Sequence, residues 1–303
     1  MKVAASIGRL HIVAIAALGT FTFGWIFTGE HRFDLAAVAA LDWFLVNLLN
    51  RVVDLREDQL NGITGTELVA RHKRTLVVVG FGVLAASFVG VHLAVAATLW
   101  PLRAAFHALG MAYNWPLLPG VRVSPGAPSP GPRRRIKQLY FFKNTASAAG
   151  FLLTVFGFPL AASDWGARLL PGVGWPTVVL GALFFFLFEL SYEVLYDLRD
   201  APGDRAADVR TYAVVHGEKV ALRIVDVLCV LSVLSIAVAY VAGFVPWRLA
   251  VLGVGPLVQI ALAHVVVRRG ITSADCVGIT WLGAGLLFAY HVWVALGLPG
   301  AGA

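Results

Sequence analysis

The sequence predicts an all-α, polytopic membrane protein in which about nine transmembrane helices are bundled around a central cavity open to the cytoplasm. Three observations predict this fold class. Of the 303 residues, 59% are hydrophobic and only 14% are charged, whereas soluble domains are about 25% charged. Apolar stretches long enough to cross a bilayer recur along the chain. Lysine and arginine gather in alternate connections between those stretches. We interpret residues 1–303 as a single membrane domain.

Each expected span is a stretch of roughly 20 mostly apolar residues. The first stretch lacks a clear small-residue cleavage site, so we interpret it as a span and not as a signal peptide. The third and fourth stretches nearly touch, and Arg103 lies either in the fourth or in the connection before it. In chain order the expected spans are Leu10–Thr28, Leu35–Val53, Thr75–His92, Val95–Tyr113, Leu139–Ala162, Trp175–Tyr196, Val220–Ala242, Leu249–Val267 and Val277–Leu296.

The distribution of basic residues predicts the orientation. If the N-terminus lies in the cytoplasm, nearly all of the 24 lysines and arginines fall on the cytoplasmic side. The four exceptions are Arg32, Arg103, Arg168 and Arg248. The positive-inside rule therefore favours a cytoplasmic N-terminus. The same rule explains the net charge of +7, and we expect no nucleic-acid partner. The Ala-, Gly- and Arg-rich composition favours a bacterial source, and hence a bacterial cytoplasmic (inner) membrane.

The connection between the fourth and fifth expected spans has an unusual composition. Residues 115–133 hold six prolines and several glycines, and the basic run Arg133–Arg134–Arg135 closes the segment. Prolines at this density exclude a continuous helix. We expect a flexible, irregular cytoplasmic loop. The basic run is explained equally well by contact with anionic lipid headgroups and by a role at an active site.

Acidic residues are scarce, yet they cluster at two places. The second expected span ends in the pattern N-x3-D-x3-D, formed by Asn50, Asp54 and Asp58. Residues four apart lie on one face of a helix. We therefore expect an oxygen-rich stripe that runs out of the membrane at its cytoplasmic surface.

The end of the sixth expected span carries a second acidic stripe. Glu193, Asp197, Asp200 and Asp204 follow spacings of four, three and four residues. We expect the dipeptide at 202–203, Pro-Gly, to end the helix, which would leave Asp204 in a loop. Both stripes lie on the cytoplasmic side according to the distribution of basic residues.

Two facing carboxylate stripes repel each other unless cations lie between them. Hard oxygen ligands suit Mg²⁺, which takes one or two carboxylates and completes its shell with water and substrate phosphates. We therefore expect a Mg²⁺-diphosphate ligand, with Asp54, Asp58, Asp197, Asp200 and Asp204 as metal ligands. The side chains that we expect to bind the diphosphate oxygens are Asn50, Arg51, Arg56, Lys137, Lys143 and Arg199.

With these two motifs the chain resembles the UbiA superfamily of intramembrane prenyltransferases over nearly its whole length. The first motif matches the N-x3-D-x3-D of that family. The second motif, Tyr192–Glu193 through Asp204–Arg205 with the trailing Thr211 and Gly217, matches its second aspartate motif. Lys143–Asn144 resembles a recurrent basic position. The segment after the first motif departs from the Arg-Thr…Arg-Pro-Leu…Gly signature of many members, which leaves the subfamily and the acceptor open.

The resemblance implies Mg²⁺-dependent transfer of a prenyl group from an isoprenyl diphosphate to an aromatic or other lipophilic acceptor. It implies that the metal stabilises the leaving diphosphate as a Lewis acid, and that a dry cavity lined by aromatic residues protects an allylic cation. The lipid bilayer would contact the apolar tail of the donor.

Glu189 lies one helical turn deeper than Glu193, in line with Asp197. A carboxylate inside the membrane is costly and is usually functional. We hypothesise that Glu189 or Glu193 faces the acceptor and takes its proton, and a structural hydrogen bond to a neighbouring helix explains the two residues equally well. Asp42 lies on another face and has no assigned role, and we expect packing or capping roles for His107, His264 and His291.

Two other functions remain open. A terpene cyclase of the UbiA type would share the fold and both motifs. A transporter of ions or small solutes would also combine many spans with intramembrane acids. It would place those acids near the midplane, whereas here they gather at one surface. The CDP-alcohol phosphatidyltransferases are excluded, because their D-G-x2-A-R signature is not present.

Overall fold

Long apolar helices make up most of the computed structural model, which describes residues 6–124, 127–140, 142–207 and 209–298, with the side chains of 121–130 left aside. Within this part of the chain, eight helices are long and apolar enough to cross a membrane. They are α2 (Leu10–Thr28), α3 (Phe33–Val53), α6 (Lys73–Ala94), the continuous helix of α8 (Phe142–Leu152), η3 (Leu153–Gly157) and α9 (Phe158–Ala162), α10 (Trp175–Ala206), α12 (Glu218–Val241), the continuous helix of α13 (Trp247–Ala250), η4 (Val251–Gly253) and α14 (Val254–Arg268), and α15 (Ser273–Ala295). These eight match eight of the nine expected spans, with ends that shift by a few residues except at α10.

The fourth expected span corresponds to the short 3₁₀ helix η1 (Ala97–Leu99) and to α7 (Trp100–Asn114). With 15 residues, α7 is shorter than the roughly 20 residues of a full crossing. It lies beside α3 and α6, and Arg103 is inside it. The count of nine spans therefore remains a prediction.

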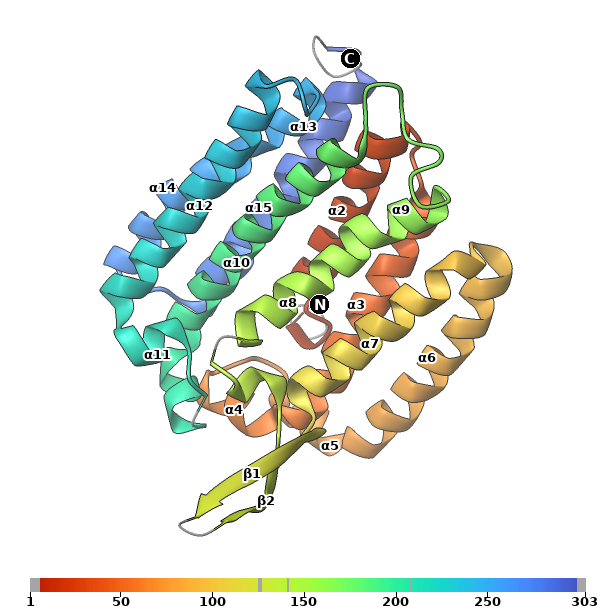
Figure 1. The fold of residues 1–303 in the computed structure, drawn as a ribbon. Coiled ribbons are helices and arrows are strands. Elements are labelled where there is room, and N and C mark those ends of the chain that lie inside the picture. The colour runs from red at the N-terminus through yellow and green to blue at the C-terminus, as the bar shows by residue number, and fades with distance from the viewer. Residues whose placement is uncertain (1–5, 125–126, 141, 208, 299–303) are drawn as a thin grey trace.

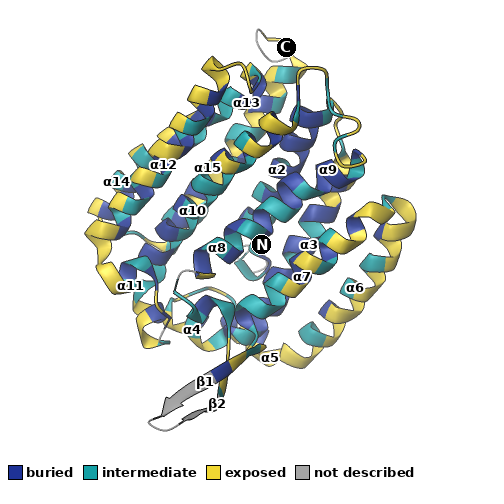
Figure 2. Cartoon of the chain, in the orientation of Figure 1, coloured by how far each residue is buried: buried dark blue, intermediate teal, exposed yellow. Residues whose placement is uncertain are grey.

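The outer surface of the bundle is apolar where a soluble protein would be polar. On α6, Val78 is 72% exposed, and on α12, Val241 is 85% exposed. Exposed residues follow the outer sides of these helices from end to end (Figure 2). A continuous apolar surface of this kind requires lipid around it. The chain is thus an integral, multi-pass membrane protein.

The interior holds the aromatic side chains. The largest buried cluster joins Phe23 and Trp25 of α2 to Trp43 of α3, Phe156 of η3 and Phe184 of α10. The rings of Phe23 and Phe156 lie 4.2 Å apart between centroids, and those of Trp43 and Phe151 lie 4.1 Å apart. This cluster fixes α2, α3, α8 and α10 around one centre.

Short elements gather at one end of the bundle. They are α4 (Leu55–Leu60), α5 (Thr66–Arg71), the 3₁₀ helix η2 (Ile136–Gln138) and α11 (Tyr212–His216). Figure 1 places them together with the β-hairpin below the long helices. Both acidic motifs lie at this end, since α4 follows α3 directly and α11 follows α10.

The irregular loop expected at 115–133 is in fact a β-hairpin. Strands β1 (Leu118–Ser124) and β2 (Ala127–Arg134) pair antiparallel, with an irregularity in register between Leu118 and Gly120. A two-stranded ribbon has only edge strands, and edge strands tolerate proline because each has one side without ladder bonds. The proline content therefore excluded a helix, as predicted, without excluding a strand.

Helix α10 runs ten residues beyond the expected end of the sixth span. Pro202 lies inside it and the helix continues to Ala206, so Asp204 is helical and not in a loop. The proline removes only the backbone bond to Leu198 near the end of the helix. Gly203 lies close to the side chain of Asn61, since a Cβ there would lie 2.2 Å from its Oδ1 and Asn61 would have to move. This contact joins the end of α10 to the segment after α4.

Candidate active site

Both acidic motifs line a single cavity of about 720 Å³ in the described part of the chain. Its walls come from α2, α3, α4, α7, α8, α10 and α15. The first motif contributes Asn50, Asp54 and Asp58, and the second contributes Glu193, Asp197, Asp200 and Asp204. The expected central cavity is thus present, and it brings together two stripes that are about 140 residues apart in the sequence.

The first stripe lies where α3 ends and α4 begins. Asp54 is the C-cap of α3 and is 7% exposed, and Lys137 Nζ donates to its Oδ1 at 2.7 Å. Burial raises the pKa of Asp54, and the neighbouring Lys137 ammonium opposes that shift. Asp58 Oδ2 accepts a hydrogen bond of 2.7 Å from Arg51 Nη1. Each carboxylate is therefore buried and paired with a basic side chain.

The second stripe lies on α10 opposite α8. Lys143 Nζ of α8 bridges two of its carboxylates, at 2.7 Å from Asp197 Oδ1 and 2.9 Å from Asp204 Oδ2. Asn144 Nδ2 donates to the other oxygen of Asp197 at 2.9 Å. Asp200 pairs with its neighbour Arg199. In this stripe, too, a basic side chain neutralises the acids.

Five of the six residues expected to bind diphosphate line the cavity. They are Asn50, Arg51, Lys137, Lys143 and Arg199. The sixth, Arg56, is exposed and does not line it. The reason is helical geometry. Arg56 lies two residues from Asp54 and from Asp58, and therefore on the opposite side of α4.

The two glutamates of α10 also face the cavity, one turn apart. Glu193 Oε1 accepts a hydrogen bond of 2.6 Å from Ser147 Oγ of α8. Glu189 also lines a second, apolar pocket of about 340 Å³, and no hydrogen bond to its carboxylate is found among the described residues. The structural hydrogen bond considered for these residues is therefore present for Glu193.

Several cavity residues escaped the sequence analysis. Glu57 is three residues from Asp54, a helical spacing that could have identified it, and it pairs with Lys137 and with Arg135 at 3.0 Å. Arg9, Asn61 and Tyr113 also line the cavity. They are isolated in the sequence and belong to no pattern. The ion pair between Arg135 and Glu57 places the end of the basic run 133–135 beside the cavity. Contact with lipid headgroups therefore does not account for the whole run.

The donor set is suitable for Mg²⁺. In the described ranges, no three His, Cys, Asp or Glu side chains converge on a point that could hold a metal ion by themselves. Mg²⁺ usually takes one or two protein carboxylates and fills its octahedral shell with water and phosphate oxygens. A cavity with several carboxylates on each of two walls, none of them gathered into a group of three, and with Asn50 and Asn61 in its lining, fits an ion that arrives with a diphosphate.

Asp42 and the three histidines left outside the expected site have partners away from the cavity. Asp42 binds Arg103 and His107 of α7, at 2.6 Å and 3.0 Å from its Oδ1. His264 bonds Asp226 at 2.9 Å, and His291 bonds Thr22 at 3.0 Å. The packing roles expected for the three histidines are consistent with these contacts.

Comparison with known proteins identifies the fold and the family. The UbiA prenyltransferase family model matches residues 12–277. A solved UbiA homologue from Archaeoglobus fulgidus, bound to DMAPP and Mg²⁺, is similar with a TM-score of 0.67 and 14% identity, over 94% of this chain and 96% of that one. The apo structure of a UbiA homologue from Aeropyrum pernix K1 has a TM-score of 0.57 and 15% identity, over 96% and 99% of the two chains.

A curated relative adds a shorter match. Digeranylgeranylglyceryl phosphate synthase of Methanopyrus kandleri is 35% identical over 88 residues, which is 29% of this chain and 32% of that protein. The match thus spans about a third of the relative. At this length it supports the family without assigning a substrate. Since the family model covers most of the sequence, including both acidic motifs, the chain belongs to the UbiA prenyltransferase family.

Proposed function

We propose that this protein transfers a prenyl group from an isoprenyl diphosphate to an aromatic or other lipophilic acceptor and releases diphosphate in a Mg²⁺-dependent reaction. The observation that carries the proposal is the single cavity lined by both acidic stripes and by buried lysines. Membership of the family supports the reaction class. The homologue solved with DMAPP and Mg²⁺ supports the choice of donor and metal.

The acidic side chains would hold the metal, and the basic ones would hold the diphosphate. Mg²⁺, when bound, would neutralise charge on the departing diphosphate. The ligands would come from Asp54 and Asp58 on one wall and from Asp197, Asp200 and Asp204 on the other. Lys137 and Lys143 are 4% and 8% exposed, and their ammonium groups would exchange carboxylate oxygens for diphosphate oxygens when the donor enters.

The reaction balances with groups that the chain supplies. The C–O bond between the prenyl carbon and the diphosphate breaks, and its electron pair leaves with the diphosphate oxygen. A carbon or oxygen of the acceptor attacks the allylic cation and forms the new bond. The proton that the acceptor loses passes to the carboxylate of Glu189 or Glu193. The aromatic walls, which include Trp43, exclude water from the cation.

We also propose the orientation that the basic residues predict. The N-terminus and the cavity would face the cytoplasm, in a bacterial inner membrane. Ser6 accepts a bond from Arg51 and donates one to Thr64, so the start of α2 lies at the cavity end of the bundle. The N-terminus and the cavity would therefore face the same compartment.

Diphosphate release by the purified protein in lipid nanodiscs tests the proposal. Prenyl diphosphates of graded length would be supplied with a panel of lipophilic acceptors, with and without Mg²⁺. The comparison is between wild type, the Asp54→Ala/Asp197→Ala variant, and the control Asp226→Ala, whose carboxylate pairs with His264 away from the cavity. We expect release that requires Mg²⁺ and acceptor, is lost in the double variant and persists in the control.

Two results would contradict the proposal. Release without an acceptor, together with a cyclised hydrocarbon product, would make the protein a terpene cyclase. No release with any donor, together with movement of divalent cations across the bilayer, would make it a transporter.

A further inference from the structure

Arg248 differs from the other basic residues that lie away from the expected cytoplasmic side. Each of the other three pairs with a carboxylate, in the ion pairs Arg32–Asp34 at 2.7 Å, Arg103–Asp42 at 2.6 Å and Arg168–Asp164 at 2.8 Å. Arg248 has no acidic partner among the residues that the structure describes, and residues 299–303 hold no Asp or Glu. Of the four exceptions to the positive-inside rule, Arg248 is therefore the one whose charge is not balanced within the described chain.

The side chain of Arg248 is buried except for its outer nitrogens. The residue is 7% exposed, and its guanidinium carbon lies over the ring of Trp25, 5.6 Å from the ring centroid. Nε is buried without a hydrogen-bond partner, whereas Nη1 and Nη2 reach the surface. Neither Nη atom donates a hydrogen bond to a described residue. A buried charge without a counter-ion is strongly unfavourable, and the aromatic ring offsets only part of that cost. The two outer nitrogens therefore suit an anion that comes from outside the chain.

Three helices hold Arg248 in position. Tyr290 Oη of α15 donates to the carbonyl oxygen of Arg248 at 2.9 Å. In the turn just before Arg248, the carbonyl oxygen of Phe244 accepts a hydrogen bond of 2.7 Å from Thr177 Oγ1 of α10. The ring under the guanidinium belongs to α2. The cation is thus positioned before any ligand arrives, which lowers the entropy cost of binding.

Arg248 is also the second residue of the long helix Trp247–Arg268. The first backbone N–H groups of a helix have no acceptor within it, and the helix dipole favours an anion at this end. The first turn carries no acidic side chain that could serve as that anion. Backbone and side chain therefore present positive charge at the same place.

The surroundings of Arg248 indicate which anion fits. Figure 1 places α13 at the end of the bundle opposite the β-hairpin and the short helices. Tyr240, Phe244 and Trp247 are exposed at this end, and the rings of Tyr240 and Trp247 lie 5.8 Å apart between centroids. Tyrosine and tryptophan gather where a bilayer meets water. The anion that every bilayer presents at this level is the phosphodiester of a phospholipid.

We propose that Arg248 and the start of its helix bind the phosphodiester of a glycerophospholipid in the leaflet opposite the cavity. Nη1 and Nη2 would donate to two phosphate oxygens, in the fork geometry for which a guanidinium is suited. The acyl chains would lie along the exposed apolar side of α12, which includes Val238 and Val241. This lipid site does not depend on the prenyl transfer proposed above.

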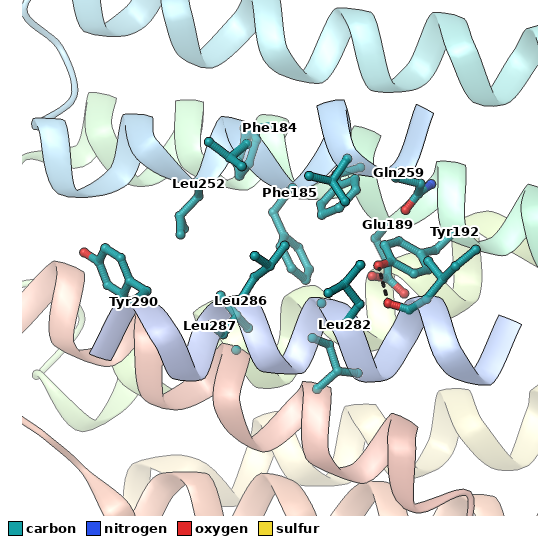
Figure 3. Close-up of a pocket in the computed structure, with 18 of the residues that line it drawn as sticks. Phe184, Phe185, Glu189, Tyr192, Leu252, Gln259, Leu282, Leu286, Leu287 and Tyr290 are labelled. Atoms are coloured by element: carbon teal, nitrogen blue, oxygen red, sulfur yellow. Dashed lines mark hydrogen bonds between the residues drawn. The ribbon is translucent and has the colours of Figure 1, made fainter. Parts of the chain in front are cut away.

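A lipid bound there would stabilise one end of the second, apolar pocket. This pocket of about 340 Å³ lies between α2, α10, α14 and α15. Figure 3 shows Tyr290 at one end of it and Glu189 at the other. Because the Tyr290 hydroxyl bonds the backbone of Arg248, a lipid on Arg248 would hold α13 against α15 at the end remote from Glu189. We therefore expect the lipid to raise the thermal stability of the bundle.

Photocrosslinking in nanodiscs locates the lipid. Phosphatidylglycerol with a diazirine in its head group would be offered to wild type, to Arg248→Gln and to the control Arg168→Gln, whose guanidinium pairs with Asp164 in the loop before α10. We expect labelling of the segment 240–250 in wild type and in the control, and about tenfold weaker labelling in Arg248→Gln, the equivalent of one charge-assisted hydrogen bond. Unlabelled phosphatidylglycerol should compete, whereas neutral diglucosyl diacylglycerol and inorganic phosphate should not.

Thermal unfolding in detergent gives a second readout. Added phosphatidylglycerol should raise the melting temperature of wild type, of Arg168→Gln and of the charge-conserving Arg248→Lys more than that of Arg248→Gln. The cytoplasmic basic residues also attract anionic lipid, so the difference between variants is the quantity that counts.

The competition arms on wild type keep the test decisive if Arg248→Gln does not fold. No labelling of the segment 240–250 in wild type, or equal competition by the neutral lipid, would show that no phosphate is bound there. Competition by inorganic phosphate would identify a site for a soluble anion and would overturn the assignment to a lipid. Equal labelling of wild type and a folded Arg248→Gln variant would remove Arg248 from the site.

Discussion

Two of the groups of buried charge in the described residues differ in what surrounds them. At the end of the cavity, Asp54, Asp197 and Asp204 face a space of about 720 Å³ and are neutralised by lysines. Between α3, α6 and α7, Asp42 and Arg103 are 0% and 1% exposed and line none of the described pockets. Intramembrane charge is often a sign of function, but only the first group has room for a ligand.

The hydrogen-bond partners explain the difference. Arg103 donates to both oxygens of Asp42, at 2.6 and 2.8 Å, and to the carbonyl oxygen and hydroxyl of Ser87 on α6. The planar guanidinium is thereby held in a fixed fork. The lysines at the cavity hold carboxylates through a single flexible ammonium, which can turn to a new anion. The pair Asp42–Arg103, which we call the closed group, joins three helices. The acids and lysines at the cavity, which we call the open group, are arranged so that the lysines can exchange a carboxylate for another anion.

The largest effect should come from the open group. We expect Asp54→Asn to lower the rate of prenyl transfer about 10²–10³-fold, because it removes a carboxylate that would hold the Mg²⁺ whose charge stabilises the departing diphosphate. The melting temperature in detergent should stay close to that of wild type. Unfolding of this variant at the assay temperature would show that Asp54 is structural.

The closed group should behave in the opposite way. Asp42→Leu leaves Arg103 buried without its counter-ion, and we expect a loss of about 3–5 kcal/mol in unfolding free energy. The Asp42→Leu/Arg103→Leu double variant should recover part of that loss. Chemical denaturation in mixed micelles measures both. A stable Asp42→Leu variant with no activity would place Asp42 in the reaction.

A smaller effect is expected for the lysine that bridges Asp197 and Asp204. Lys143→Met should raise the KM for the donor about 10–100-fold, since a charged hydrogen bond contributes about 1.5–3 kcal/mol. The exposed Lys219, replaced in the same way, serves as the control. An unchanged KM for the donor would mean that Lys143 only neutralises the acids of the cavity and does not bind the diphosphate.

The smallest effect is expected for Arg56, the expected diphosphate-binding residue that does not line the cavity. Arg56 is exposed and lies outside the cavity, so Arg56→Ala should leave KM and kcat for the donor within about twofold, as for a surface substitution. A tenfold rise in the KM for the donor would restore the role that the sequence analysis assigned to this residue.

The sequence by itself predicted the membrane class, eight of the spans and the acidic stripes. Each of these is a local property of the chain. Hydropathy over 20 residues determines a span, and a spacing of four residues places Asp54 and Asp58, or Glu189 and Glu193, on one face of their helix. The rules for proline gave wrong predictions at two places in the chain. Pro202 did not end α10, and the prolines of 115–133 did not prevent a hairpin.

Only the tertiary structure decided how residues distant in sequence meet. It placed Lys143 between Asp197 and Asp204, brought Arg9 and Asn61 to the cavity, and gave Asp42 a buried partner. It also left Gln259 Oε1 without a hydrogen-bond partner among the described residues. The physical reason is that these contacts depend on the packing of helices against one another. Helix packing is set by shape and burial across the whole bundle, and no local spacing encodes it.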